Sequence, residues 1–208
     1  EESGFWRSRD LLDSIIPFNI KEDLGGAEFA RLNTKLVTEM GNRDDWAANY
    51  SSPGTISRRT PTSKPLTGDT PAVARFKRML LEKAEIYLET KSKYLNPIMA
   101  NGGRLAISRF VGLKVSKLAE EPTHIHSGSV LSGVHYPYIP ASVSDRGRAG
   151  HIDFGRPDID AAGPPPPLRT IQPETGLLLL FPAYLFHRIL PGDFGEERFS
   201  IAFDFGSI

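Results

Sequence analysis

The chain of 208 residues contains no cysteine, which excludes disulfides, thiolate metal ligands and a cysteine nucleophile. It also lacks an excess of charge, because 25 Lys and Arg residues balance 25 Asp and Glu residues. The basic residues are scattered rather than gathered in a stripe, so we expect neither a nucleic-acid partner nor a polybasic membrane patch. The longest apolar run, over residues 177–181, is far too short to span a bilayer, so we expect no membrane partner. The lack of cysteine favours a cytoplasmic location.

The composition indicates one globular domain in two parts. Hydrophobic residues make up 39% of the chain and charged residues 24%, as in an ordinary globular protein, and 208 residues can bury one substantial core. Residues 1–104 have helical and irregular patterns, and residues 105–208 have short apolar segments separated by turn residues. We therefore predict an N-terminal helical and loop elaboration over 1–104 that packs on a catalytic core over 105–208.

Two helices are predicted in the N-terminal part. Apolar residues recur at helical spacing over residues 27–40, and Gly41 follows as a plausible C-cap. A second helix is predicted over residues 70–92, because Thr70 is a good N-cap and Pro71 favours the first helical position.

The second half has the pattern of an antiparallel jelly roll, so the fold class is mainly β with N-terminal helices (α+β). Long loops are predicted over residues 42–69 and 155–175, where they border the entrance to a binding site. The candidate strands are residues 106–117, 124–126, 131–139, 150–154, 177–181 and 199–205.

The last strand alternates between two kinds of side chain. Its bulky apolar residues form one face that packs on the core or on helices. The other face places Arg198 and Ser200 side by side, where a guanidinium and a hydroxyl can bind one carboxylate.

Three histidines suggest a metal site. His124 and His126 point to the same face of an extended segment, because side chains two residues apart in a strand share a face. His187 lies 63 residues beyond His124, just after the apolar run 177–181. Imidazoles without thiolates suit Zn, Cu, Fe or Ni, and two residues on one strand with a distant third indicate a non-haem Fe(II) oxygenase.

The two segments HIHSGSVLSGVHY (124–136) and TGLLLLFPAYLFHRILPGDFGEERFSIAFDF (175–205) resemble the Fe(II)- and 2-oxoglutarate-dependent dioxygenase superfamily. They are similar to a bacterial and phage subgroup that has a His-x-His motif and, about ten residues after its distal histidine, an Arg-x-Ser motif. The chain departs from the subgroup at Ser127, His135 and Asp204, where proline, tyrosine and asparagine are common.

The resemblance implies a double-stranded β-helix (jelly roll) that works as a hydroxylase. Its cofactors are Fe(II) and the cosubstrate 2-oxoglutarate, with O2 as the oxidant. The substrate is expected to be an amino acid, a peptide or another polar small molecule. The implied metal ligands are His124, His126 and His187, and the implied cosubstrate-binding residues are Arg198, Ser200 and His135.

The third metal ligand stays open at this point. His126 stands where the superfamily usually has a carboxylate, so the triad is all histidine if His126 binds the metal. Asp153 could instead reach the metal from a neighbouring strand, or the metal could have only two protein ligands. The motif His151-Ile152-Asp153 is a rival start of the triad, but it lies only 36 residues before His187, which leaves room for too few strands.

Two other functions also fit these motifs. A cupin-like enzyme could use three histidines as a metal dioxygenase or isomerase without 2-oxoglutarate, and a non-catalytic jelly roll could bind a ligand through its loops. Arg109 and Arg156 are weak candidates for substrate contacts, and Arg188 is expected to point away from the metal. Exposed strands at the edge of a jelly roll leave a homodimer open.

Overall fold

The computed structural model describes seven segments of the chain. They are residues 8–48, 56–59, 70–95, 103–118, 123–144, 147–155 and 169–208. Most of the two predicted long loops, including Arg156 and the four consecutive prolines at 164–167, lies outside these segments.

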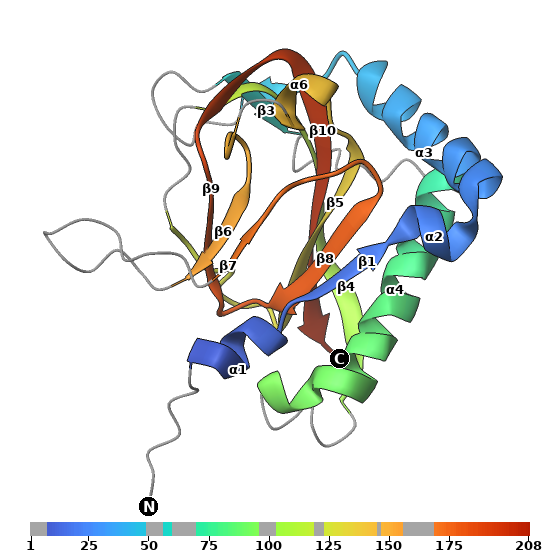
Figure 1. Ribbon diagram of the computed structural model, residues 1–208. Coiled ribbons are helices and arrows are strands. Elements are labelled where there is room, and N and C mark those ends of the chain that lie inside the picture. Colours follow the sequence, from blue (N-terminus) through green and yellow to red (C-terminus); the bar gives the residue numbers. More distant parts are fainter. Residues whose placement is uncertain are drawn as a thin grey trace, which may run out of the picture.

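Both predicted helices are present in the N-terminal part (Figure 1). The helix predicted over 27–40 is α3, and Gly41 is its last residue rather than its C-cap, which is Asn42. The helix predicted over 70–92 is α4, and the Thr70 side chain caps it by accepting from the backbone N–H of Val73. The elements are α1 Ser8–Asp13, β1 Ile16–Asn19, α2 Ile20–Leu24, α3 Gly26–Gly41, β2 Ala47–Ala48, β3 Ile56–Arg59, α4 Pro71–Lys91 and the short 3-10 helix η1 Ser92–Tyr94.

The strands of the described residues form two antiparallel sheets. One has seven strands in the order β1-β8-β5-β10-β4-β3-β2, and the other has three in the order β7-β6-β9. The sheets enclose a barrel interior, which confirms the predicted double-stranded β-helix (Figure 1). The elements are β4 Leu105–Leu118, β5 Leu131–Tyr138, α6 Ala141–Ser144, β6 Ile152–Gly155, β7 Arg169–Ile171, β8 Leu177–Pro182, β9 Phe186–Ile189 and β10 Gly192–Ser207.

Helices α3 and α4 cover the outer face of the large sheet (Figure 1). The predicted alternation in the last strand is what allows this, because one face of β10 is apolar over residues 199–205. Phe199, Ile201, Phe203 and Phe205 pack in one buried cluster with side chains of both helices. Their neighbours along β10 therefore point to the other side of the sheet, into the barrel.

A second apolar cluster lies between the two sheets. Tyr136 of β5 and Phe181 of β8 meet Ile152 and Phe154 of β6 there. This packing holds the small sheet against the large one and lines this part of the barrel with apolar side chains.

The N-terminal part contributes strands as well as helices, which the sequence pattern did not predict. β1 pairs with β8, and β3, within the predicted loop 42–69, pairs with β4. Both strands are only four residues long. Because β3 falls within residues 42–69, the prediction of one long loop there was wrong. The division of the chain at residue 104 remains a prediction. Of the helices in the described segments, none has both the length and the apolar character that a membrane crossing requires.

Candidate metal centre and cosubstrate pocket

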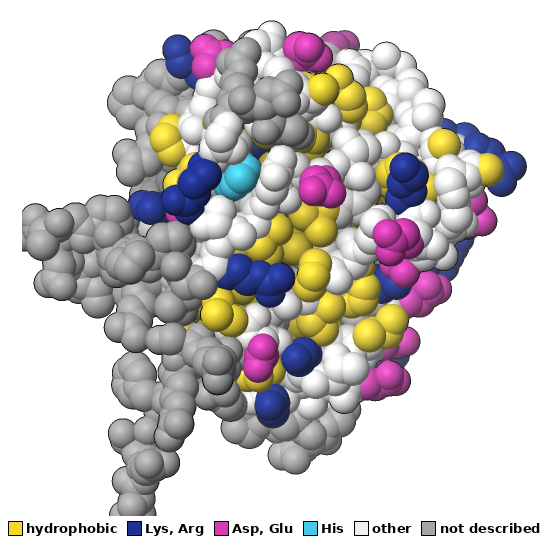
Figure 2. Space-filling view, in the orientation of Figure 1, with side chains coloured by type: hydrophobic (Ala, Val, Ile, Leu, Met, Phe, Trp, Pro, Cys, Tyr) yellow, Lys and Arg dark blue, Asp and Glu magenta, His cyan; other side chains and the backbone are white. Residues whose placement is uncertain are grey.

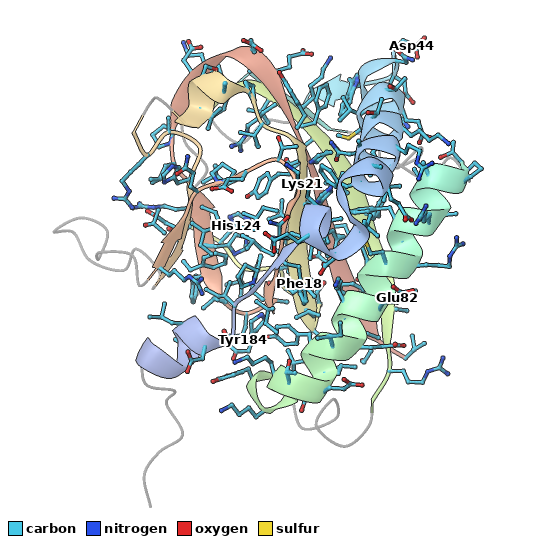
Figure 3. The ribbon with its side chains drawn as sticks, turned by 45° about the vertical axis from the view of Figure 1, so that its right-hand side comes forward. Phe18, Lys21, Asp44, Glu82, His124 and Tyr184 are labelled. Atoms are coloured by element: carbon cyan, nitrogen blue, oxygen red, sulfur yellow. The ribbon has the colours of Figure 1, made fainter. Side chains whose placement is uncertain are left out.

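The structure brings the three predicted histidines together inside one end of the barrel. One ring nitrogen from each of His124, His126 and His187 lies within 4.8 Å of the others. The ring centroids of His124 and His187 are 4.4 Å apart, and those of His126 and His187 are 5.0 Å apart. His124 lies on the barrel side of the molecule, away from the helix layer (Figure 3). Three imidazoles at this separation fit a single transition-metal ion of the kind that nitrogen ligands prefer.

Backbone hydrogen bonds hold the two histidine-bearing segments together. The N–H of His124 donates to the carbonyl of His187 at 2.9 Å, and the N–H of His187 donates back at 3.1 Å. The N–H of His126 donates to the carbonyl of Ala183 at 2.9 Å. His124 forms an isolated bridge rather than part of the predicted regular strand 124–126. These backbone hydrogen bonds nevertheless fix the relative positions of the backbone segments that carry the histidines.

His187 is buried in an apolar wall. Its Nδ1 donates to the carbonyl of Leu185 at 2.9 Å, which leaves Nε2 to face the cluster. The rings of Phe181 and Phe154 lie 4.9 Å and 6.0 Å from the imidazole centroid. Burial first, and then the charge of His124, lowers the pKa of His187 to about 3. His187 is therefore neutral at ordinary pH, as a metal ligand must be.

Behind His126 lies Asp204, which the sequence analysis noted only as a departure from the subgroup. The Nδ1 of His126 is 2.5 Å from Asp204 Oδ1, and that oxygen also accepts from the Ser132 hydroxyl at 2.7 Å. Arg109 approaches the other carboxylate oxygen at 3.3 Å. Burial by itself would raise the pKa of Asp204, but the bonds to His126 and Ser132 and the charge of Arg109 lower it.

A signal for Asp204 was present in the sequence. Asp204 continues the alternation that places Arg198 and Ser200 on the inner face of the last strand. The same alternation directs its carboxyl group into the barrel. The alternation does not reveal that β10 carries it to the height of His126.

Arg198 and Ser200 both lie on the inner face of β10. Arg198 is among the largest fully buried side chains of the described residues, and Ser200 is 3% exposed. Arg198 donates from Nη1 to the carbonyl of Gly150 at 3.0 Å, and its guanidinium lies 4.9 Å from the ring centroid of Phe194. A buried guanidinium beside a hydroxyl can bind a carboxylate through charge-assisted hydrogen bonds.

His135 does not join this cluster, which corrects the prediction that it binds the cosubstrate. It pairs with Ile201 on the opposite face of the large sheet, and its ring lies 4.9 Å from that of Phe76 on α4. Its Nδ1 is 3.1 Å from the carbonyl of Leu177, and burial lowers its pKa to about 4. Strand periodicity separates the two faces of β5 but does not reveal which of them points into the barrel. His135 lies on the face that points away from it.

Asp153, the alternative third ligand, lies on the outer face of the small sheet. Its neighbours in β6, Ile152 and Phe154, point into the barrel, so Asp153 points out. Its carboxylate accepts from Arg148 and Thr170, and Arg188 is paired with it at 3.5 Å. The assignment of Asp153 as a metal ligand was therefore wrong, and Arg188 points away from the histidines as expected.

A polar pocket of about 470 Å³ opens beside the histidine cluster. Arg109 is half-exposed at this opening, with Asp204 behind it. The residues that line the pocket include no apolar side chain: they are Ser108, Arg109, His124, His126, Ser127, Gly128, Ser129 and Asp204. Basic and acidic side chains are interspersed over the face shown in Figure 2, in agreement with the balanced composition.

Comparison with known proteins agrees with this geometry. Residues 113–204, just under half of the chain, match the family described as "Putative 2OG-Fe(II) oxygenase". This confirms the resemblance, and with it Fe(II) and 2-oxoglutarate as the cofactors. The histidine cluster fits the metal ion. No curated protein matches the chain.

Solved structures share the fold at low identity. A Pseudomonas putida prolyl-4-hydroxylase is 13% identical with a TM-score of 0.59, and the match covers 96% of this chain and 97% of that one. HygX from Streptomyces hygroscopicus, with nickel and 2-oxoglutarate bound, is 13% identical with a TM-score of 0.59 and coverages of 97% and 87%. The α-ketoglutarate-dependent epimerase SnoN from nogalamycin biosynthesis is 12% identical with a TM-score of 0.62 and coverages of 96% and 82%.

Proposed function

We propose that this 2OG-Fe(II) oxygenase holds its iron on His124, His126 and His187 and hydroxylates an amino acid, a peptide or another polar small molecule. The observation that carries the proposal is the convergence of these three imidazoles in the barrel that also encloses Arg198. When bound, Fe(II) and 2-oxoglutarate would supply oxidative chemistry in which O2 and 2-oxoglutarate are consumed, succinate and CO2 are released and a substrate C–H bond is oxidised.

The protein's own residues would orient the cosubstrate and keep water away from it. Arg198 and Ser200 would bind the far carboxylate of 2-oxoglutarate. Their burial on the inner face of β10 supports this assignment. Phe154 and Phe181 line the wall next to His187 and exclude water from that side. This buried arginine is a reason to prefer a 2-oxoglutarate enzyme over a cupin-like enzyme that does not use it.

The pocket beside the histidines supports a polar substrate. Its lining consists of hydroxyl, imidazole, guanidinium and carboxylate side chains, and an apolar molecule would leave those groups without hydrogen-bond partners. Arg109 is placed to meet an anionic group of the substrate, since it is half-exposed at the pocket opening. The prolyl-4-hydroxylase fold relative agrees with hydroxylation, and the epimerase relative makes epimerisation the second outcome to test.

The test is an incubation of the purified protein with Fe(II), 2-oxoglutarate and O2 in the presence of pooled amino acids and short peptides. The proposal expects succinate to form in an amount that rises with the right substrate, and a product 16 mass units heavier, as insertion of one oxygen atom requires. An epimerised product of unchanged mass would replace hydroxylation. The absence of succinate across pools that do bind to the protein would reject 2-oxoglutarate chemistry and favour the cupin-like alternative.

A further inference from the structure

We propose that Asp204 is a positioning residue that supplies, from behind His126, the negative charge that a three-histidine metal site lacks. The inference rests on the proposed function, because it concerns the same site. Three neutral imidazoles leave the full charge of a divalent ion uncompensated, whereas a directly bound carboxylate would cancel part of it. The structure instead holds a carboxylate, that of Asp204, against the Nδ1 of His126.

The register of the large sheet fixes the position of Asp204. β10 lies between β5 and β4, and Asp204 pairs with Ser132 on one side and with Arg109 on the other. All three side chains therefore point to the same face, into the barrel. The Ser132 hydroxyl, fully buried, donates to Oδ1 at 2.7 Å, and Arg109 approaches Oδ2 at 3.3 Å.

Asp204 is buried, and a buried carboxylate is stable only when its oxygens are paired. The third partner, His126 Nδ1 at 2.5 Å, shares Oδ1 with the Ser132 hydroxyl. An ionised carboxylate only accepts hydrogen bonds, so the proton of this pair lies on His126 Nδ1. The lone pair of the imidazole is then on Nε2, the atom that remains to face His124 and His187.

A carboxylate in this position does two things for a metal ligand. It fixes the tautomer and the orientation of the ring, and it makes the ligating nitrogen more basic. His187 donates from Nδ1 to the neutral carbonyl of Leu185, whereas His126 has an ionised partner in Asp204. Asp204 therefore acts through His126 and does not itself touch the metal.

The experiment measures the affinity of the purified, metal-free protein for Co(II), used as an air-stable substitute for Fe(II). Asp204→Ala is expected to weaken Co(II) binding by about 10- to 100-fold, the usual effect of removing a group that orients a metal ligand. Asp204→Asn keeps an oxygen that can accept from Nδ1 but loses the charge, so a smaller loss is expected. Asp153→Asn is the matched control, since this buried carboxylate is held by Arg148 and Thr170 on the outer face of the small sheet, and it should leave the affinity unchanged.

A second pair of variants separates positioning from a general structural role. In the background of His126→Ala, the added Asp204→Ala substitution should cost no further Co(II) affinity, because the residue through which Asp204 acts is gone. Equal affinity in the wild-type protein and Asp204→Ala would overturn the inference while leaving the proposed function intact. A further loss in the His126→Ala background would also overturn it, since Asp204 would then act on the metal without His126. A wild-type protein that binds no Co(II) would instead reject the proposed function.

Discussion

Arg198 and Gly150 join the two sheets across the barrel: the guanidinium donates from Nη1 to the Gly150 carbonyl at 3.0 Å. Gly150 precedes β6 of the small sheet, whereas Arg198 belongs to β10 of the large one. The residue proposed to bind the cosubstrate is thus held at both ends, by its own strand and by the opposite sheet. A guanidinium fixed in this way loses little conformational freedom when it binds a carboxylate.

Replacing Arg198 should weaken cosubstrate binding more than it affects the metal. A buried charge-assisted contact contributes about 1.5–3 kcal/mol, so Arg198→Ala should raise the dissociation constant of 2-oxoglutarate by about 10- to 150-fold. Calorimetric titration of the metal-loaded protein measures this effect. Arg198→Lys keeps the charge but not the paired donors and should show an intermediate loss, which protects the test if the alanine variant folds poorly.

Arg188→Ala is the control for that prediction. Arg188 is also an arginine on a barrel strand, but it pairs with Asp153 on the outer face of the small sheet. Its removal should leave 2-oxoglutarate affinity as it is in the wild type. If Arg198→Ala is folded and binds 2-oxoglutarate as tightly as Arg188→Ala does, Arg198 has no part in cosubstrate binding.

Gly150 is needed for the position of Arg198. It has a φ of +72°, and a Cβ added there would lie 2.7 Å from Arg198 Nη1 and 3.0 Å from the ring of Phe194. Gly150→Ala should therefore destabilise the fold and also weaken 2-oxoglutarate binding. Gly147 has a φ of +64° with nothing within 4 Å of its added Cβ, so Gly147→Ala should show only the backbone cost of about 1–2 kcal/mol.

The difference between these two alanine variants isolates the contact with Arg198. Chemical denaturation gives the free energy of unfolding of each, and 2-oxoglutarate titration gives the cosubstrate affinity. The affinity should fall in Gly150→Ala alone. An equal affinity in both variants would mean that the guanidinium can move without loss of binding.

His135 should affect stability and leave the cofactors alone. Burial lowers its pKa from 6.5 to about 4 in the folded protein, so between these values the unfolded chain binds a proton that the folded chain does not. The free energy of unfolding should therefore fall as the pH drops from about 6.5 to about 4, with His135 contributing roughly 3 kcal/mol to that fall. Above the unfolded value the contribution is flat.

His135→Asn removes the titrating group and keeps a side-chain donor for the carbonyl of Leu177. Denaturation at several pH values should show a shallower acid dependence in this variant than in the wild type. Its affinity for metal and for 2-oxoglutarate should not change, because the ring packs against Phe76 on the helix side of the sheet. If the variant binds 2-oxoglutarate more weakly and its stability has the same acid dependence as the wild type, His135 takes part in cosubstrate binding and the prediction is wrong.

The sequence predicted the parts of the fold that repeat a simple period. The apolar positions of α3 and α4, and the alternation of β10, are visible in the residues alone because each element buries one face. β1 and β3 were missed because they are strands of four residues whose place depends on the partner strand beside them. Propensity carries little information for such segments.

The candidate site shows the same limit. The three histidines and Arg198 could be found from motif spacing, which reflects the order of strands in the barrel. The face of β5 that His135 occupies could not, because a shift of one residue in register exchanges the two faces of a strand. The role of Asp204 could not be predicted without knowing that Ser132 and Arg109 flank it. That arrangement is a property of the assembled sheet.

The most direct test of this account counts metal ions on the protein and on variants of its histidines. Under anaerobic conditions the wild-type protein should bind one Fe(II) per chain. The single substitutions His124→Ala, His126→Ala and His187→Ala should each weaken Fe(II) binding by more than about 100-fold. That is more than the loss of a residue that only orients a ligand can cause. His151→Asn, a change outside the cluster, should keep wild-type affinity. Full Fe(II) affinity in the His126→Ala or the His187→Ala variant would contradict the claim that three imidazoles share one ion.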